Sequence, residues 1–460
     1  MGSPLRQVLM GRVGLGLAAL GLTAASGCAH AQVDAPAQAA APATKVCPDF
    51  MPAETRCFTG QDANGAYYWI AIPKAWNGAL VLHTHGGPRL KAPKPDDALE
   101  DLERFSVTVK EGFAWAGSNY RRAGYGVRGA AEDSDTLRQI FWDKFGRPKR
   151  TLLHGQSWGG NVAAKTAELY GVGQDGKPVY DGVILTSAVL AGGSRSYDFR
   201  ADLRAVYQYY CANHPQADEP FYPLWQGLPL GAKLTNKELD ARLNACTGVD
   251  LPVDQRTARQ KRNLANILAV IRIPERTLGS HLGWATFTFS DMVNKRLDGH
   301  NPFSNVGVAY TGSDDDVALN RDVARFAADP KGVKALSYDS DLTGELRVPT
   351  LTMHAIDDPT AFVELEQVFH DTVEKVGKSD LLVQSFTDEH EHSKLATPEY
   401  AALLRAMTDW LDAGTKPTPA TLAGICEEAK TTYGEACHFQ TDYKPAPLAS
   451  RSYARKKPGL

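Results

Sequence analysis

One serine stands out in the sequence as a candidate nucleophile. Ser157 lies within Gly155-Gln156-Ser157-Trp158-Gly159, after a short apolar segment and before an alanine-rich one. These flanks predict a buried strand over 151–154 and a helix over 160–170, with the serine on the sharp turn between them. Glycines two residues before and two residues after the serine allow strand and helix to approach closely. The pattern predicts an exposed, reactive hydroxyl at the edge of a sheet.

A serine hydroxyl is a weak nucleophile at neutral pH, so it needs a general base and an acid that orients the base. On a strand–serine–helix arrangement, these groups are expected in the order serine, acid, histidine along the chain. The segment 348–354 predicts a late buried strand, and Asp357 and Asp358 follow it. Asp358 is the preferred acid, because it comes three residues after the small residue that ends the strand. Asp357 is the alternative.

The base is expected in the loop 387–393, which follows the last predicted strand. His392 is preferred, because a small residue follows it and a helix is predicted from residue 398; His390 is the alternative. These histidines do not predict a metal site, since the segment is not an evident helix and no third ligand is indicated. No metal or other cofactor is expected.

Two backbone amides are candidates for binding the oxyanion that forms during acyl transfer. An apolar strand predicted over 80–84 runs into His85-Gly86-Gly87-Pro88. Glycines directly after a strand let N–H groups point into a site. The amide of Gly87, paired with that of Trp158, is therefore expected to form the oxyanion hole.

These motifs together resemble the α/β-hydrolase superfamily, over about residues 57–193 and 344–412. Within the superfamily, His85-Gly86-Gly87-Pro88 and the Ser-Trp-Gly-Gly sequence at 157–160 are similar to the prolyl-aminopeptidase-like branch. The segment 73–87 instead resembles exported bacterial hydrolases of undefined specificity. The resemblance implies an α/β-hydrolase fold and a catalytic triad of the serine, histidine and acid named above.

Alternating elements along the chain agree with this fold class. Period-two and apolar runs predict strands at 67–72, 79–83, 113–118, 151–154, 183–187, 351–354 and 381–386. Helices are predicted at 98–111, 131–145, 160–170, 362–376 and 398–412. The alternation predicts a mostly parallel sheet covered by helices on both faces. Asn77-Gly78 predicts a hairpin between the first two strands, so that the sheet begins antiparallel.

The alternation breaks between about residues 193 and 344, where strand signals are missing and aromatic residues are frequent. We interpret this interval as a cap inserted into the hydrolase core. Most of its aromatic side chains are expected to pack inside the cap. A few are expected to line a cavity that suits an apolar or aromatic acyl or alcohol group.

The amino terminus has the features of an export signal: two arginines and then an apolar segment, 13–25, too short to span a bilayer comfortably. Ala29-His30-Ala31 fits ordinary signal cleavage, whereas Ala25-Ser26-Gly27-Cys28 resembles a lipobox that would place a lipid on Cys28. The lipoprotein is preferred, and either processing predicts a periplasmic, membrane-anchored or secreted protein. The predicted organisation is a signal peptide (1–28), a tether (29–45), a core in two parts (46–192 and 344–412), a cap (193–343) and a C-terminal extension (413–460).

The remaining six cysteines are an even number, which in an exported chain indicates disulfides. Fifteen pairings are possible for six cysteines. Because the positions fall into three near-neighbour couples, the expected bonds are Cys47–Cys57, Cys211–Cys246 and Cys426–Cys437.

Charge excludes one class of partner. The chain has 50 Lys and Arg against 53 Asp and Glu, a net charge of -3, so nucleic acid is not expected to bind. The basic run 451–457 is interpreted as a solvated tail.

The predicted function is an exported serine hydrolase that cleaves a small carboxylic ester through an acyl-enzyme. A proline-releasing aminopeptidase acting on short peptides is the alternative. It would need carboxylates for the substrate's amino group, for which Asp314, Asp315 and Asp316 are candidates. These acids are more simply the start of a helix over 317–326. A third hypothesis is a non-catalytic binding protein that has a hydrolase fold.

Overall fold

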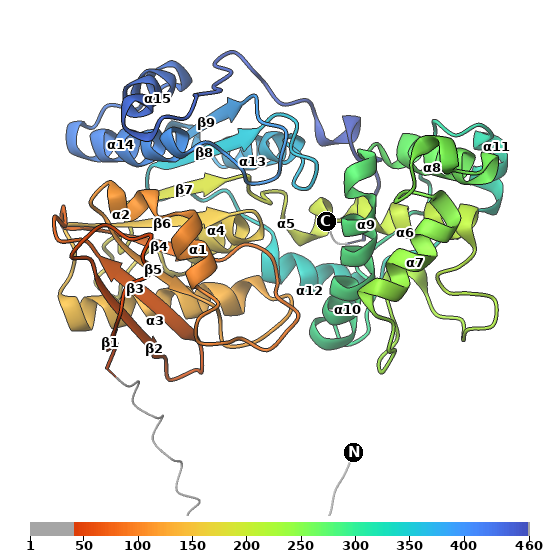
Figure 1. Cartoon of the computed structure of the whole chain (residues 1–460), viewed down its shortest axis with the longest axis horizontal. Coiled ribbons are helices and arrows are strands. Elements are labelled where there is room, and N and C mark those ends of the chain that lie inside the picture. The colour runs from red at the N-terminus through yellow and green to blue at the C-terminus, as the bar shows by residue number, and fades with distance from the viewer. Residues whose placement is uncertain (1–40, 459–460) are drawn as a thin grey trace, which may run out of the picture. The chain divides into compact units, whose positions relative to one another are not determined.

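Nine strands form one sheet within residues 41–458, the part of the chain that this computed structural model describes (Figure 1). The strands are β1 (Ala43–Lys45), β2 (Arg56–Gln61), β3 (Tyr67–Ile72), β4 (Ala79–Thr84), β5 (Ala114–Ser118), β6 (Arg150–Gln156), β7 (Gly182–Thr186), β8 (Thr350–Ala355) and β9 (Leu382–Thr387). Their order is β1-β2-β3-β5-β4-β6-β7-β8-β9. Strands β4 to β9 are parallel, whereas β1, β2 and β3 pair antiparallel with their neighbours. The predicted mostly parallel sheet is confirmed.

The predicted hairpin at Asn77-Gly78 is wrong. Strand β3 pairs with β5, which separates it from β4. The Asn77 side chain accepts a hydrogen bond from the Ala79 amide at 2.9 Å, and the Gly78 carbonyl accepts one from the Lys149 amide at 2.8 Å. The dipeptide therefore ends a connection to a non-adjacent strand. Its composition favours a chain reversal, but strand pairing decides which strands become neighbours.

Helices cover both faces of the sheet (Figure 1). Apolar side chains of α3, α4 and α13 pack on one face, and those of α2, α14 and α15 pack on the other. Along β4, Leu80 and Leu82 point to the first face and Val81 points to the second, as the period of a strand requires. These helices and α1 have the bounds α1 (Leu99–Arg104), α2 (Val107–Lys110), α3 (Val127–Phe145), α4 (Trp158–Tyr170), α13 (Glu364–Lys375), α14 (Thr397–Ala413) and α15 (Pro419–Tyr433).

Between β7 and β8 the described chain contains helices and no strand of the sheet, in the interval where the sequence predicts a cap. We call this interval the helical insert. Thr235 and Thr257 start α7 and α8 with capping boxes, each side chain accepting a hydrogen bond from the third residue of its helix. The insert contains α5 (Gly192–Ser196), α6 (Asp198–Cys211), α7 (Asn236–Thr247), α8 (Ala258–Ile271), α9 (Leu278–Gly283), α10 (Phe289–Arg296), α11 (Asp316–Asp322) and α12 (Pro330–Ser340).

The three predicted disulfides are confirmed: Cys47–Cys57, Cys211–Cys246 and Cys426–Cys437. The second joins the end of α6 to α7 in the helical insert, and the third joins α15 to the loop that follows it. The predicted signal peptide, Cys28 and most of the predicted tether lie outside the described residues. The last tether residues, Ala43–Lys45, form β1 and pair with β2.

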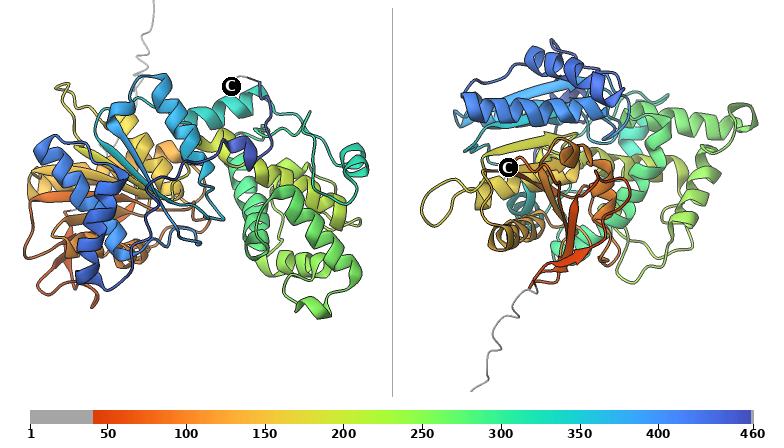
Figure 2. Two further views of the ribbon diagram at one scale, coloured as in Figure 1. Left: turned by 90° about the horizontal axis from the view of Figure 1, so that it is seen from above. Right: turned by 60° about the vertical axis from the view of Figure 1, so that its left-hand side comes forward.

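The interpretation of residues 451–457 as a solvated tail is wrong. After α15 the chain crosses from the sheet to the helical insert (Figure 2). There Arg455 lies 2.5 Å from Asp202, and Lys457 lies 2.6 Å from Asp198. All four side chains are at least nine-tenths buried, so the tail supplies the cations that the buried acids of α6 require.

No helix among residues 41–458 is both long and apolar enough to cross a bilayer.

Candidate active site

Ser157 lies on a strained turn between β6 and α4. Its φ of 59° and ψ of -128° fall in a region that L residues rarely adopt. A Cβ atom on Gly155 would collide with the Gly159 carbonyl, and one on Gly159 would collide with the Thr84 carbonyl. The two glycines allow the helix to begin directly above the strand, as their spacing predicts.

Ser157, His392 and Asp358 form a continuous chain of hydrogen bonds. Nε2 of His392 lies 2.8 Å from Oγ of Ser157, and Nδ1 of His392 lies 2.7 Å from Oδ2 of Asp358. Since Nδ1–H donates to the carboxylate, Nε2 has the lone pair that accepts the serine proton. The amides of Thr360 and Ala361 donate to Oδ1 of Asp358 at 2.8 and 3.0 Å, which fixes the carboxylate. The fold thus brings together three loops that each follow a parallel strand.

The two alternative residues, Asp357 and His390, form a separate pair. Nδ1 of His390 lies 2.8 Å from Oδ2 of Asp357, and the two side chains are 64% and 61% exposed. In the described structure, neither side chain contacts Ser157 or lines the cavity around it. The geometry therefore favours Asp358 and His392.

A buried histidine, His354, lies behind Asp358. Its Nδ1 lies 3.2 Å from Oε1 of Glu366, and its Nε2 lies 2.7 Å from the Ala361 carbonyl and 3.5 Å from Asp358. Both ring nitrogens face acceptors, so the ring is an imidazolium. Burial would lower the pKa of His354, but Asp358 and Glu366 raise it to about 10. The sequence carries no signal for this residue beyond its place in a strand.

The charge of Asp358 is maintained by the two imidazoles beside it. Burial alone would raise the pKa of Asp358, but His392 and His354 hold it well below its usual value. The carboxylate therefore stays ionised at neutral pH and can stabilise a positive charge on His392.

Gly87 lines the same cavity as Ser157 and His392. Its φ of 72° favours glycine, and no atom of residues 41–458 lies within 4 Å of the place where a Cβ would stand. Trp158 is the first residue of α4, where the N–H groups have no acceptor within the helix. Both predicted oxyanion-hole residues thus have amides in suitable backbone settings.

Asp101, which the sequence does not identify, binds the side chain of His85 at the end of the strand before Gly87. Nδ1 of His85 lies 2.5 Å from Oδ2 of Asp101, which is 5% exposed. The Tyr120 hydroxyl donates to the His85 carbonyl at 3.1 Å. These bonds fix the residues that precede the glycines. Asp101 lies in a predicted helix and has no motif around it.

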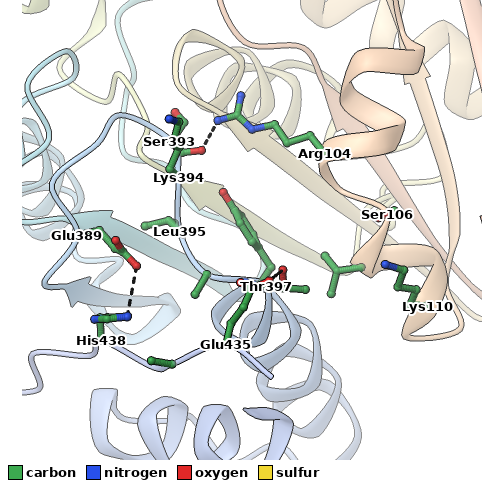
Figure 3. A pocket seen from close by; sticks show the side chains of 14 residues that line it. Arg104, Ser106, Lys110, Glu389, Ser393, Lys394, Leu395, Thr397, Glu435 and His438 are labelled. Atoms are coloured by element: carbon green, nitrogen blue, oxygen red, sulfur yellow. Dashed lines mark hydrogen bonds and ion pairs between the residues drawn. The ribbon is translucent and has the colours of Figure 1, made fainter. Parts of the chain in front are cut away.

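A larger hollow of about 530 Å³ lies beside the loop of His392 but does not include Ser157 (Figure 3). Arg104 points to the carbonyl oxygen of Ser393 and binds it, which supports the loop directly after His392 (Figure 3). Glu389 lies 3.8 Å from His438 across the same hollow. Arg104 therefore supports the loop that carries His392, and this hollow does not include the candidate nucleophile.

The cavity at Ser157 has a volume of about 230 Å³ and is lined by the core and the helical insert. Tyr197, Phe199 and Trp284 form its aromatic wall, and the Tyr197 and Trp284 rings are 4.3 Å apart. Trp284 begins a π-helical turn, an irregularity that is frequent at functional sites. The volume is below the ~300–1,000 Å³ of drug-sized ligand pockets, so the cavity suits a small acyl group.

The acids Asp314, Asp315 and Asp316 lie elsewhere. Asp314 pairs with Arg262 at 2.5 Å, and the Asp315 side chain caps α11. The helix that they start ends at Asp322, earlier than predicted. Among the described residues, no Asp or Glu lines the cavity at Ser157. The wall carries a cation instead, Arg200, which the sequence does not single out.

Comparisons with known proteins are distant. No protein-family model matches the chain. An o-phthalyl amidase of Xanthobacter agilis is 23% identical over 452 residues, which covers 86% of this chain and 96% of the relative. Feruloyl esterase B from Aspergillus oryzae is 13% identical, with a TM-score of 0.44 over 83% of this chain and 88% of that one. Tannin acyl hydrolase from Aspergillus niger is also 13% identical, with a TM-score of 0.38 over 83% of each chain.

Since these TM-scores are below 0.5, the fold assignment rests on the topology of the chain itself. A mostly parallel sheet with helices on both faces carries a serine on a strand–turn–helix elbow. An aspartate and a histidine follow the last two strands, in that order. The chain therefore has the α/β-hydrolase fold.

Proposed function

We propose that this protein is a serine hydrolase that cleaves a carboxylic ester through an acyl-enzyme. The observation that carries the proposal is the unbroken set of hydrogen bonds from Ser157 through His392 to Asp358, at 2.8 and 2.7 Å. This arrangement supplies a nucleophile, a general base in the required tautomer and an ionised acid that stabilises the imidazolium.

The proposed reaction has two halves. Oγ of Ser157 attacks the acyl carbon while Nε2 of His392 takes its proton, and the amides of Gly87 and Trp158 bind the oxyanion. The C–O bond then breaks, and Nε2 returns the proton to the leaving alcohol. In the second half, water attacks the acyl-enzyme, gives its proton to Nε2 and releases the acid, and Ser157 recovers its proton.

Cleavage of an amide is the second candidate. The Xanthobacter relative is an amidase, and the same residues would protonate a leaving amine. Substrates that share one leaving-group skeleton separate the candidates. We expect turnover of p-nitrophenyl acetate to exceed that of p-nitroacetanilide, and the reverse order would favour an amidase. Proline p-nitroanilide tests the peptidase alternative, which the cavity disfavours because no carboxylate lines it in the described structure.

We further propose that the protein acts outside the cytoplasm. Three disulfides fit an oxidising compartment. Attachment to a membrane through a lipid on Cys28 remains part of this proposal. Mass spectrometry of the mature amino terminus tests it: a lipid-modified Cys28 supports the anchor, and a start after Ala31 supports secretion.

The first test is Ser157→Ala. Turnover should fall by about 10⁶, as when the nucleophile of a triad is removed, with the melting temperature retained. A fluorophosphonate probe should label the wild-type protein and not the variant. Wild-type protein that is folded but neither labelled nor active on esters or amides would instead support a non-catalytic binding protein.

A further inference from the structure

A buried arginine faces the proposed catalytic cavity, and among the described residues no carboxylate lines that cavity with it. Arg200 is on α6, is 5% exposed and lines the cavity together with Ser157 and His392. In the described part of the chain, its one side-chain hydrogen bond runs from Nε to Nδ1 of His281, at 3.3 Å. Its two terminal nitrogens therefore have no hydrogen-bond partner there. Burying a charge in this way is costly unless another group binds it.

His281 determines how the guanidinium is presented. Nε2 of His281 lies 2.8 Å from the Pro359 carbonyl and donates to it, so Nδ1 is the acceptor for Nε–H of Arg200. Burial and the nearby Arg200 lower the pKa of His281 to about 3, so the ring stays neutral at pH 7. Arg200 is thus held through Nε by His281, which is itself bound to the residue that follows Asp358. The terminal nitrogens of Arg200 are left for another partner.

Aromatic rings pack against the guanidinium of Arg200. Its carbon lies 4.4 Å from the centre of the Trp284 ring and 4.8 Å from that of Phe199. Burial lowers the pKa of Arg200 to about 10, which leaves it a cation at pH 7. A planar guanidinium with two parallel N–H donors matches the two oxygens of a carboxylate.

A second buried arginine on α6 shows that burial alone does not make this site. Arg204 is fully buried, and its Nη2 lies 3.5 Å from the Gly227 carbonyl. It does not line the cavity at Ser157. Arg204 is therefore a matched control for Arg200 on the same helix.

We propose that Arg200 binds a carboxylate of the substrate. The preferred substrates are then esters or amides of small aromatic acids that carry a second, ionised carboxyl group. The aromatic wall and the volume of about 230 Å³ fit one ring, and Arg200 supplies the charge that such a group needs. This inference rests on the proposed hydrolase function and specifies its substrate class.

Matched esters test the substrate class on the wild-type protein. We compare kcat/KM for methyl benzoate with that for the monomethyl esters of phthalate, isophthalate and terephthalate. At least one monoester should exceed methyl benzoate by about 10–100-fold, the range expected of a charged hydrogen-bonded pair. The proposal is overturned if methyl benzoate is hydrolysed as well as, or better than, all three.

Substitutions test whether Arg200 causes the preference for a monoester over methyl benzoate. Arg200→Gln should lower kcat/KM for the preferred monoester by about 10–100-fold and lower that for methyl benzoate much less. Arg200→Lys should retain part of the preference, because it keeps the charge but not the fork. Arg204→Gln should change both substrates by the same factor. If Arg200→Gln also reduces both substrates equally, Arg200 only supports the fold.

Binding measurements distinguish failure of the carboxylate site from failure of the hydrolase function. If wild-type protein hydrolyses none of these esters, the intact monoesters and methyl benzoate become ligands for calorimetry. Binding of a monoester at least about tenfold tighter than methyl benzoate, lost in Arg200→Gln, would support the carboxylate site although hydrolysis had failed. Equal affinities would refute the carboxylate site, whatever the protein hydrolyses.

Discussion

Two histidine–aspartate pairs lie almost adjacent in the sequence but in opposite surroundings. His392–Asp358 and His390–Asp357 have nearly equal N–O distances, 2.7 and 2.8 Å. The Asp358 side chain is 0% exposed, and its histidine contacts Ser157. Both members of the other pair are more than 60% exposed. The same two residue types therefore meet in one case inside the protein and in the other in water.

The difference shows that burial and further contacts, more than the bond itself, give such a pair a function. In water the attraction between two charges is largely screened, so an exposed pair contributes little. Around Asp358, two backbone amides and two imidazoles fix the carboxylate and its charge. Only this pair can hold a histidine in one tautomer beside the serine.

The largest expected effect is on the two histidines. His392→Ala should lower kcat by about 10⁶, because the proton of Ser157 loses its acceptor. His390→Ala is the matched control and should leave kcat within about twofold, since substitutions at exposed sites have small effects. Steady-state kinetics on p-nitrophenyl acetate measures both. A large loss in His390→Ala, with His392→Ala active, would reverse our assignment.

The two aspartates should differ by a somewhat smaller factor. Asp358→Asn should lower kcat by about 10⁴, because an amide no longer holds His392 in the tautomer that accepts the serine proton. Asp357→Asn should stay within about twofold of the wild-type rate. Near-equal kcat values for the two variants would show that the buried carboxylate is not the acid of the site.

The smallest of these contrasts concerns stability. His354→Gln removes a buried cation between Asp358 and Glu366 and should lower the free energy of unfolding by about 3–5 kcal/mol at pH 6. The folded pKa of about 10 lies above the unfolded value of about 6.5, so this stabilisation is full below pH 6.5 and is lost as pH rises toward 10.

Urea unfolding of the wild type and His354→Gln between pH 6 and 10 measures this contrast. The difference in unfolding free energy should shrink as pH rises. His390→Gln, whose partner Asp357 is exposed, is the control and should differ little from the wild type at any pH. A gap in His354→Gln that is constant with pH would mean that His354 is neutral in the folded protein.

Much of the fold can be predicted from local patterns in the sequence. The strands β3 to β9 lie within a few residues of their predicted positions, because buried strands read as short apolar runs. Strand β2 was missed, since its residues are mostly part-exposed and carry no clear apolar run. The hairpin at Asn77-Gly78 was wrong because turn composition does not reveal that β5 lies between β3 and β4.

By itself the sequence determined the elbow serine and the three disulfides, because each depends on residues close together along the chain. Spacing favoured Asp358 over Asp357 and His392 over His390, but the sequence held no information on which of these side chains would be buried. Tertiary structure decided that Asp358 and His392 meet Ser157, that the basic tail neutralises the acids of α6, and that Arg200 faces the cavity. The physical reason is common to all three. The burial and the partners of a charged group come from segments far away in the sequence, and no local pattern records them.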